Sequence, residues 1–192
     1  MNKNRLEAFS DGVIAIVITI MVLELKAPPG NTLAALLPEL PDFLSYVLSF
    51  VYVAIYWNNH HHLLHSVSRV NAAILWANMN LLFWMSLVPF TTAWMGQNGF
   101  AHIPTALYGL SLLMPAFSYY LLQNAIVGHQ GRDGALAKAL GRDWKGKLSL
   151  GLYCIGIGTS FVAPWVALAI YLGVALLWFI PDRRIERALT LS

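Results

Sequence analysis

The sequence predicts an all-α integral membrane protein, a bundle of six transmembrane helices. Of its 192 residues, 58% are hydrophobic and only 11% are charged, whereas soluble domains have about 45–50% apolar and about 25% charged residues. The mean hydropathy is +0.60. The apolar residues also gather in runs bounded by charged residues, Pro or Gly, and a crossing of the bilayer core needs about 20 mostly apolar helical residues.

Other classes of protein do not fit this composition. The apolar content excludes a disordered chain, and the single cysteine, Cys154, excludes a disulfide-stabilised secreted fold. The net charge of +3 comes from few charged residues rather than from a dense basic patch, which argues against nucleic acid as a partner. No nucleotide-binding loop, paired-cysteine metal site or nucleophile elbow is present. We therefore expect neither an enzyme nor a protein with a cofactor.

Six apolar runs define the expected helices. The last apolar stretch, residues 148–180, would be about 50 Å long as one helix, and Pro164 divides it into a tight hairpin. The polar segment before it, residues 128–147, is expected to be an amphipathic or loop connection. All six helices are expected to form one transmembrane domain over residues 1–192. The predicted ranges are about 8–25, 43–67, 71–92, 104–127, 148–163 and 165–180.

The basic residues support six crossings. An even number of crossings places both termini and two connections on one side of the membrane. The opposite side holds Lys26 alone. This asymmetry predicts that both termini are cytoplasmic, because basic residues are enriched on that side. The basic residues on the predicted cytoplasmic side are Lys3, Arg5, Arg69, Arg132, Lys138, Arg142, Lys145, Lys147, Arg183, Arg184 and Arg187.

The first predicted helix carries polar residues near its beginning. Arg5, Ser10 and Asp11 lie there, and an Asp at the centre of a transmembrane helix costs roughly 2.5–3.5 kcal/mol, less toward the interface. One interpretation is that Asp11 needs a hydrogen-bond donor on a neighbouring helix. The other is that Ser10 and Asp11 cap the helix, with Arg5 as a flanking anchor.

An aliphatic stripe follows on the same helix. Ile16, Thr19, Ile20 and Leu23 lie at offsets of three, four and seven residues, so they share one face. If several copies of this helix met around an axis, the stripe would form stacked apolar rings with one ring of hydroxyls, and narrow apolar rings can gate an ion path by dewetting. Ordinary helix packing is the more frequent use of such a stripe. The spacing leaves both uses open.

The second predicted helix ends in a polar segment, WNNHHHLLHSV. His61 and His65 lie four residues apart and could hold a metal or a haem iron, but no Cys or Glu pattern completes a set of ligands. The run from His60 to His62 could instead anchor the helix at the interface or provide partners for the first helix. The topology allows convergence at one depth of Arg5, Ser10, Asp11, Trp57, Asn59, His60, His61 and Asn78.

Aromatic residues near the predicted helix ends are expected at the interface with the lipid headgroups, where Trp and Tyr are enriched. Pro89 is expected to kink the third helix. The aromatic residues are Tyr119, Tyr120, Trp144, Trp165 and Trp178.

Motifs in the first three helices resemble the transmembrane protein 175 family of potassium channels. The first helix opens with Arg5-x-x-x-Phe9-Ser10-Asp11. The second ends with Trp57-x-Asn59-His60-His61, and the third contains Leu75-Trp76-x-Asn78 and Ser86-Leu-x-Pro89-Phe90. The resemblance is specific over these three helices and only compositional over the last three. It identifies the chain as a single-repeat bacterial member.

The resemblance implies a potassium-favouring cation channel of the bacterial inner membrane, a homotetramer in the lipid bilayer with the first helix lining the pore. It implies a hydrophobic constriction at Ile16, followed by Ile20 and Leu23, and a selectivity role for Thr19 beside the permeating potassium. Arg5, Phe9, Ser10 and Asp11 are expected to hold the pore helix through the second and third helices. The alternatives are a proton-coupled transporter and a metal- or haem-binding protein that uses the histidines.

Overall fold

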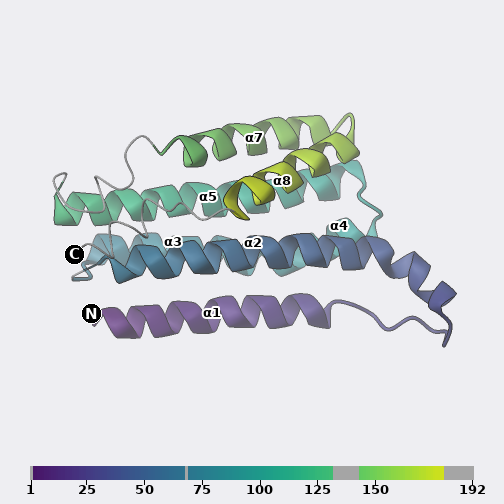
Figure 1. The fold of residues 1–192 in the computed structure, drawn as a ribbon, viewed down its shortest axis with the longest axis horizontal. Helices are drawn as coiled ribbons and strands as arrows, with labels where there is room; N and C mark the ends of the chain where they lie inside the picture. Colours follow the sequence, from purple (N-terminus) through teal and green to yellow (C-terminus); the bar gives the residue numbers. More distant parts are fainter. Residues whose placement is uncertain (1, 68, 132–142, 180–192) are drawn as a thin grey trace.

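The computed structural model describes residues 2–67, 69–131 and 143–179, and within these ranges every regular element is a helix. The helices run nearly along the long axis of the molecule (Figure 1). Counted with the two consecutive helices of residues 72–97 as one span, they match the predicted count of six. The elements are α1 (Lys3–Leu23), the 3₁₀ helix η1 (Leu33–Glu39), α2 (Leu40–His65), α3 (Ala72–Ser86), α4 (Val88–Gln97), α5 (His102–Gln130), α7 (Trp144–Ser160) and α8 (Pro164–Phe179).

Most of these helices are long and apolar enough to cross a membrane. The segments Lys3–Leu23, Leu33–His65, Ala72–Gln97 and His102–Gln130 meet both requirements. The hairpin of α7 and α8 has helices of 17 and 16 residues, close to the lower limit of about 17 residues for a crossing. Together these helices describe a multi-pass membrane protein.

The first helix begins five residues before its predicted start. The side chain of Asn2 accepts a hydrogen bond from the backbone N–H of Asn4 over 3.1 Å and so caps α1 at Lys3. Ser10 and Asp11 therefore lie in the third turn. The interpretation that these two residues cap the helix is wrong.

The predicted helix 71–92 is two helices in the structure. Asn71 caps α3 by accepting a hydrogen bond from the N–H of Ile74 over 2.9 Å, and the helix is interrupted at Leu87. Pro89 lies in the first turn of α4, where its missing N–H costs little. The predicted kink takes the form of this break, and α4 continues to Gln97.

The remaining ends differ from the predictions by a few residues. The helix predicted at 43–67 is α2, which begins at Leu40, and the helix predicted at 104–127 is α5, which is longer at both ends. Pro164 opens α8, so the predicted division of the last apolar stretch is confirmed. Residues 132–142, within the predicted polar connection, and residue 180 lie outside the described residues.

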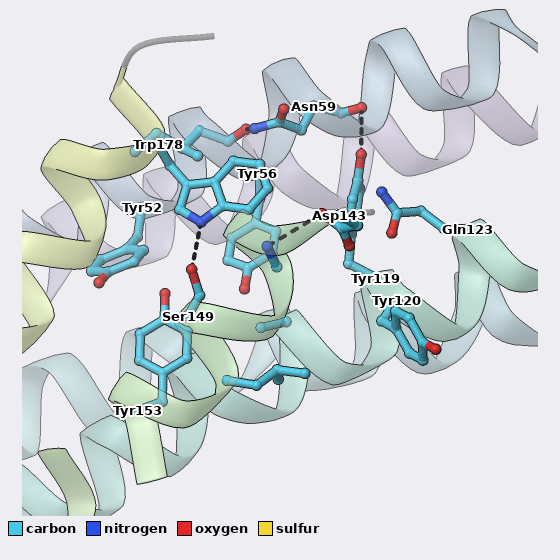
Figure 2. Close-up of a pocket in the computed structure, with 14 residues that line it drawn as sticks. Tyr52, Tyr56, Asn59, Tyr119, Tyr120, Gln123, Asp143, Ser149, Tyr153 and Trp178 are labelled. Atoms are coloured by element: carbon cyan, nitrogen blue, oxygen red, sulfur yellow. Dashed lines mark hydrogen bonds between the residues drawn. The ribbon is translucent and has the colours of Figure 1, made fainter. Parts of the chain in front are cut away.

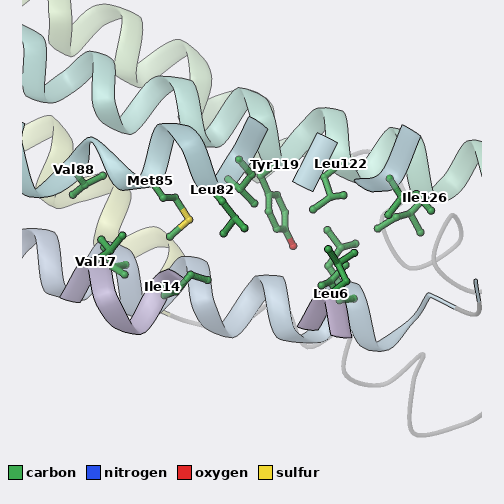
Figure 3. Packing of buried hydrophobic residues seen from close by; sticks show 14 of the residues in the cluster. Leu6, Ile14, Val17, Leu82, Met85, Val88, Tyr119, Leu122 and Ile126 are labelled. Carbon is green, nitrogen blue, oxygen red and sulfur yellow. The ribbon is translucent and has the colours of Figure 1, made fainter. Parts of the chain in front are cut away.

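The helix α1 lies at one edge of the bundle, where it packs on α2, α3 and α4 (Figure 1). The helix α5 lies between this group and the hairpin of α7 and α8. A hydrophobic cluster joins α1 to α3, α4 and α5. Figure 3 shows it, with Leu6, Ile14 and Val17 contributed by α1. Burial of α1 is confined to one face, since its buried residues are Leu6, Ser10, Ile14, Val17 and Met21.

One end of the bundle holds the beginning of α1, the end of α2 and the end of α5 (Figure 1). The ammonium of Lys3 donates to the carbonyl of His65 over 2.7 Å, and the amide of Gln130 donates to the carbonyl of Ser66 over 2.7 Å. These bonds join three helix ends. Six of the eleven basic residues predicted on the cytoplasmic side lie outside the described residues: Arg132, Lys138, Arg142, Arg183, Arg184 and Arg187. The cytoplasmic location of both termini stays a prediction.

Candidate functional site

The residues of the aliphatic stripe share the outward face of α1. The exposed fractions of Ile16, Ile20 and Leu23 are 57%, 42% and 80%, and Thr19 is exposed as well. This face lies opposite the one that packs on α2, α3 and α4, so nothing in the described chain covers it. An edge helix with an apolar outer face needs lipid or another protein surface against it.

Thr19 is the one hydroxyl residue of this stripe. Its hydroxyl donates to the carbonyl of Ile16, one turn earlier, over 2.9 Å. A hydroxyl has one hydrogen to donate and two lone pairs that can accept. Because the hydrogen is already bound, the oxygen presents only lone pairs to its surroundings, and these suit a cation or a water molecule.

A buried chain of polar side chains lies behind the stripe. Ser10, Asn78 and His60 are 0%, 0% and 1% exposed. The amide of Asn78 donates to the hydroxyl of Ser10 over 2.9 Å, and its oxygen lies 2.6 Å from Nε2 of His60. Since the Asn78 oxygen can only accept, His60 carries its hydrogen on Nε2. The chain links α1, α3 and α2 through side chains alone.

A second contact holds α1 to α2 nearer the surface. The indole Nε1 of Trp57 donates to Oδ1 of Asp11 over 3.0 Å, and bonds to a carboxylate are stronger than bonds between neutral groups. The ring of His61 stacks on that of Trp57 with 6.1 Å between centroids, and on that of His65 with 6.2 Å. Asp11 thus has the donor on a neighbouring helix that its position in the first helix required.

Three of the predicted support residues lie outside these contacts. Arg5 is exposed and Phe9 is 53% exposed, and the described part of the chain offers Arg5 no hydrogen bond or ion pair. Asn59 donates from its side chain to the carbonyl of Ile55 in its own helix over 2.8 Å. Its backbone carbonyl accepts a bond from the hydroxyl of Tyr119 over 3.1 Å.

Tyr119 is not the interfacial residue predicted from the sequence. It is only 7% exposed and ties α5 to α2 through Asn59. Lys3, which bonds to the end of α2, was expected only as a cytoplasmic charge. An apolar run gives no signal for either contact, because both depend on which face of a helix turns inward.

The histidines do not form a metal centre in the described residues, which contain no group of three or more His, Cys, Asp or Glu side chains suited to a metal ion. His61 and His65 stack side by side on α2, and both are exposed. A two-histidine pair supplies fewer ligands than the three or four of most protein metal sites.

Comparison with known proteins identifies the family. The model of the family described as "Endosomal/lysosomal potassium channel TMEM175" matches residues 5–89. This range includes the aliphatic stripe and the buried polar side chains of Ser10, His60 and Asn78. A protein of Chryseobacterium sp. (strain P1-3) named as a potassium channel is 53% identical over 189 residues, which is 98% of each chain. The chain belongs to the TMEM175 family.

A solved TMEM175 structure agrees with the fold. The crystal structure of a lysosomal potassium-selective channel TMEM175 homolog from Chamaesiphon minutus matches with a TM-score of 0.81 and 27% identity, and covers 94% of this chain and 97% of that one. TMEM175 proteins are channels rather than enzymes, which confirms the prediction that the chain is not an enzyme.

Animal members of the TMEM175 family are more distant. The human endosomal/lysosomal proton channel TMEM175 is 34% identical over 116 residues, which is 54% of this chain and 23% of the human one. The names within the family therefore include both potassium and proton channels.

Proposed function

We propose that this protein is a potassium-favouring cation channel of the bacterial cell membrane, a homotetramer whose pore is lined by α1 from each copy. The observation that carries the proposal is the exposed aliphatic face of an edge helix, with Ile16 57% exposed and Leu23 80% exposed. Several such faces meeting around an axis form a narrow apolar conduit. The potassium channel names of bacterial TMEM175 relatives support the choice of ion.

Conduction in this proposal is passive and has no chemical step or cofactor. A ring of Ile16 side chains is the tightest point, and rings of Ile20 and Leu23 follow it. Narrow apolar rings exclude water and so block ions, which makes the ring a gate that opens when it widens or rotates. Thr19 lies between Ile16 and Ile20, and its lone pairs replace part of the hydration shell of potassium.

The polar contacts behind α1 give the gate a fixed position. The exposed face of a helix sets the diameter of a pore only if the helix cannot rotate about its own axis. Ser10 is held through Asn78 at 2.9 Å, and Asp11 is held through Trp57 at 3.0 Å. Because both bonds lie in one turn of α1, they fix its rotation, and rotation decides whether Ile16 faces the axis.

Ion flux into liposomes tests the proposal. Purified protein is reconstituted and potassium uptake is compared with sodium uptake under equal gradients, with protein-free liposomes as the control. We expect potassium uptake to be faster than sodium uptake. We also expect the rate not to saturate with ion concentration, whereas the rate of a carrier does. Equal slow rates for both ions, or uptake that requires a proton gradient, would instead favour the proton-coupled transporter.

Proton conduction is a second candidate, favoured by the names of the animal TMEM175 relatives. A pH-sensitive dye inside the same liposomes measures it directly. Acidification that follows an imposed pH gradient, with potassium held equal on both sides, assigns proton permeability to the same pore. An absorbance spectrum and a metal analysis of the purified protein test the haem and metal alternatives.

A further inference from the structure

A cavity of about 50 Å³ lies between α2, α5, α7 and α8, away from α1 (Figure 2). No residue of α1 contributes to its wall, so the cavity is separate from the proposed pore. Six of its fourteen lining residues are aromatic. They are Tyr52, Tyr56, Tyr119, Tyr120, Tyr153 and Trp178.

In three of these rings the hydrogen-bond donor is bound by a partner within the protein. The hydroxyl of Tyr56 donates to the carbonyl of Leu112 over 3.3 Å, and the hydroxyl of Tyr52 donates to the carbonyl of Tyr171. The indole Nε1 of Trp178 donates to the hydroxyl of Ser149 over 2.8 Å (Figure 2). The donors of these three rings are thus already bound, and the rings offer the cavity their electron-rich faces.

One carboxylate faces this aromatic lining. Asp143 lies beside Tyr119 and Gln123 in Figure 2 and is half-buried. Its side chain caps α7 and accepts a hydrogen bond from the N–H of Gly146 over 3.2 Å, and a helix N-terminus stabilises a negative charge. Among the described residues of the lining there is no Lys, Arg or His. The lining carries a net negative charge.

We propose that this cavity binds a small alkylammonium group, with Asp143 as its counter-ion and the tyrosine and tryptophan rings as its walls. Aromatic faces attract a cation within about 6 Å of the ring centroid, most strongly where water is excluded. A cavity of about 50 Å³ has room for several waters at roughly 10–15 Å³ each. That space suits a compact head such as trimethylammonium.

The lining selects an alkylammonium group over potassium. A potassium ion gives up its hydration shell only to a set of oxygens that replaces it, and ring faces do not replace that shell. An alkylated ammonium is weakly hydrated and buries its carbon atoms against the rings. The ammonium can come from a free amine or from the headgroup of a membrane lipid.

Binding of choline and of its neutral carbon isostere, dimethylbutanol, tests the charge requirement on purified full-length protein in detergent. The two probes have the same shape and differ in charge. Equilibrium dialysis with radiolabelled probe measures the affinity. We expect saturable binding of choline and none of the isostere, with choline binding unchanged by an excess of potassium.

Two variants locate the binding at the cavity. Asp143→Asn removes the charge but keeps the helix cap, since Asn and Asp cap helices equally well, and we expect choline binding at least about tenfold weaker, as for the loss of one close ion pair. Tyr120→Leu removes a ring that is 38% exposed, and we expect a several-fold loss with little effect on folding. Asp42→Asn, on α2 and outside the lining, is the matched control and should bind as the wild type does.

Three results would overturn the proposal. Equal binding of the neutral isostere would show an apolar cavity without a cation preference. Choline binding of wild-type strength in a folded Asp143→Asn variant would remove the counter-ion. No choline binding by the wild type in lipid-free detergent would indicate a cavity filled by water. Nanodiscs with and without choline-headgroup lipids then identify the source: a lipid headgroup that occupies the cavity lowers the binding of added choline, whereas a site for free amines binds choline equally in both.

Discussion

Asn78 on α3 donates a hydrogen bond to Ser10 on α1 over 2.9 Å, and neither residue is exposed. The hydroxyl of Ser10 in turn donates to the carbonyl of Leu6 over 2.8 Å. Ser10 is thus an acceptor for one helix and a donor within its own. A buried donor left without its partner is costly, so this pair couples the position of α1 to that of α3.

Ser10→Ala is expected to destabilise the protein by about 1–2 kcal/mol, because the Asn78 amide loses its acceptor. Thermal unfolding of the purified protein measures the change. Ser86→Ala is the control: this hydroxyl is exposed and bonds only to the carbonyl of Phe83 in its own helix, over 2.7 Å. Equal melting temperatures for the two variants would mean that the bond from Asn78 contributes nothing.

Gly156→Ala is expected to destabilise the hairpin of α7 and α8. A Cβ at Gly156 would overlap the ring of Tyr171, which is fully buried, and overpacking of this kind costs about 1–3 kcal/mol. Gly158→Ala in the same helix meets nothing within 4 Å and should be neutral or stabilise by up to about 1 kcal/mol. Thermal unfolding of both variants checks the contrast. A similar effect at both positions would refute the close fit around Tyr171.

The number of membrane-spanning segments could be predicted because a chain this apolar must lie in a lipid bilayer, and each apolar run is long enough for one crossing. Their ends could not, because polar caps decide them. Asn2 extends α1 beyond the apolar run, and Asn71 sets the start of α3. A search for apolar runs finds neither of these caps, because both residues are polar. Pro89 predicted a disturbance in the third span, and the structure has it as a break at Leu87, two residues before the proline.

The buried support of α1 could be predicted in part. Topology alone brings the start of the first helix, the end of the second and the start of the third to one end of the bundle, so contacts of Ser10 with Asn78 and His60 were within reach of the sequence. The orientation of Arg5 toward the outside was not. The burial of Tyr119 could not be predicted either, since α5 has apolar residues on all sides and no periodicity marks its inner face.

Thr19→Val is expected to lower the ratio of potassium to sodium flux while conduction persists. Valine has nearly the same shape as threonine, but it has no oxygen with which to replace water around the ion. Thr19→Ser keeps the oxygen and should retain most of the discrimination. Reversal potentials in planar bilayers with potassium on one side and sodium on the other give the ratio. A wild-type ratio in Thr19→Val would exclude the hydroxyl from selectivity.

Ile16→Asn is expected to raise the leak several-fold and to weaken ion discrimination, because a polar ring at the constriction holds water where an apolar ring expels it. Single-channel recording in planar bilayers measures both effects. Val166→Asn, at an exposed position on α8, is the control for the presence of an asparagine in an apolar surface. Unchanged currents in Ile16→Asn would remove this residue from the pore.

Asp11→Ala is expected to impair assembly or expression more than selectivity. The indole of Trp57 donates to Asp11 over 3.0 Å, so the alanine variant leaves this donor without a partner at membrane depth and frees α1 to roll. Asp11→Asn keeps an acceptor for Trp57 and should recover most of the assembled protein, which separates the hydrogen bond from the negative charge. Size-exclusion chromatography with light scattering gives the assembled fraction, and liposome flux gives the ion preference of what remains. A stable Asp11→Ala oligomer with altered ion preference would contradict a role in assembly, and would mean that Asp11 acts on the ion path itself, either directly or through the rotation of α1.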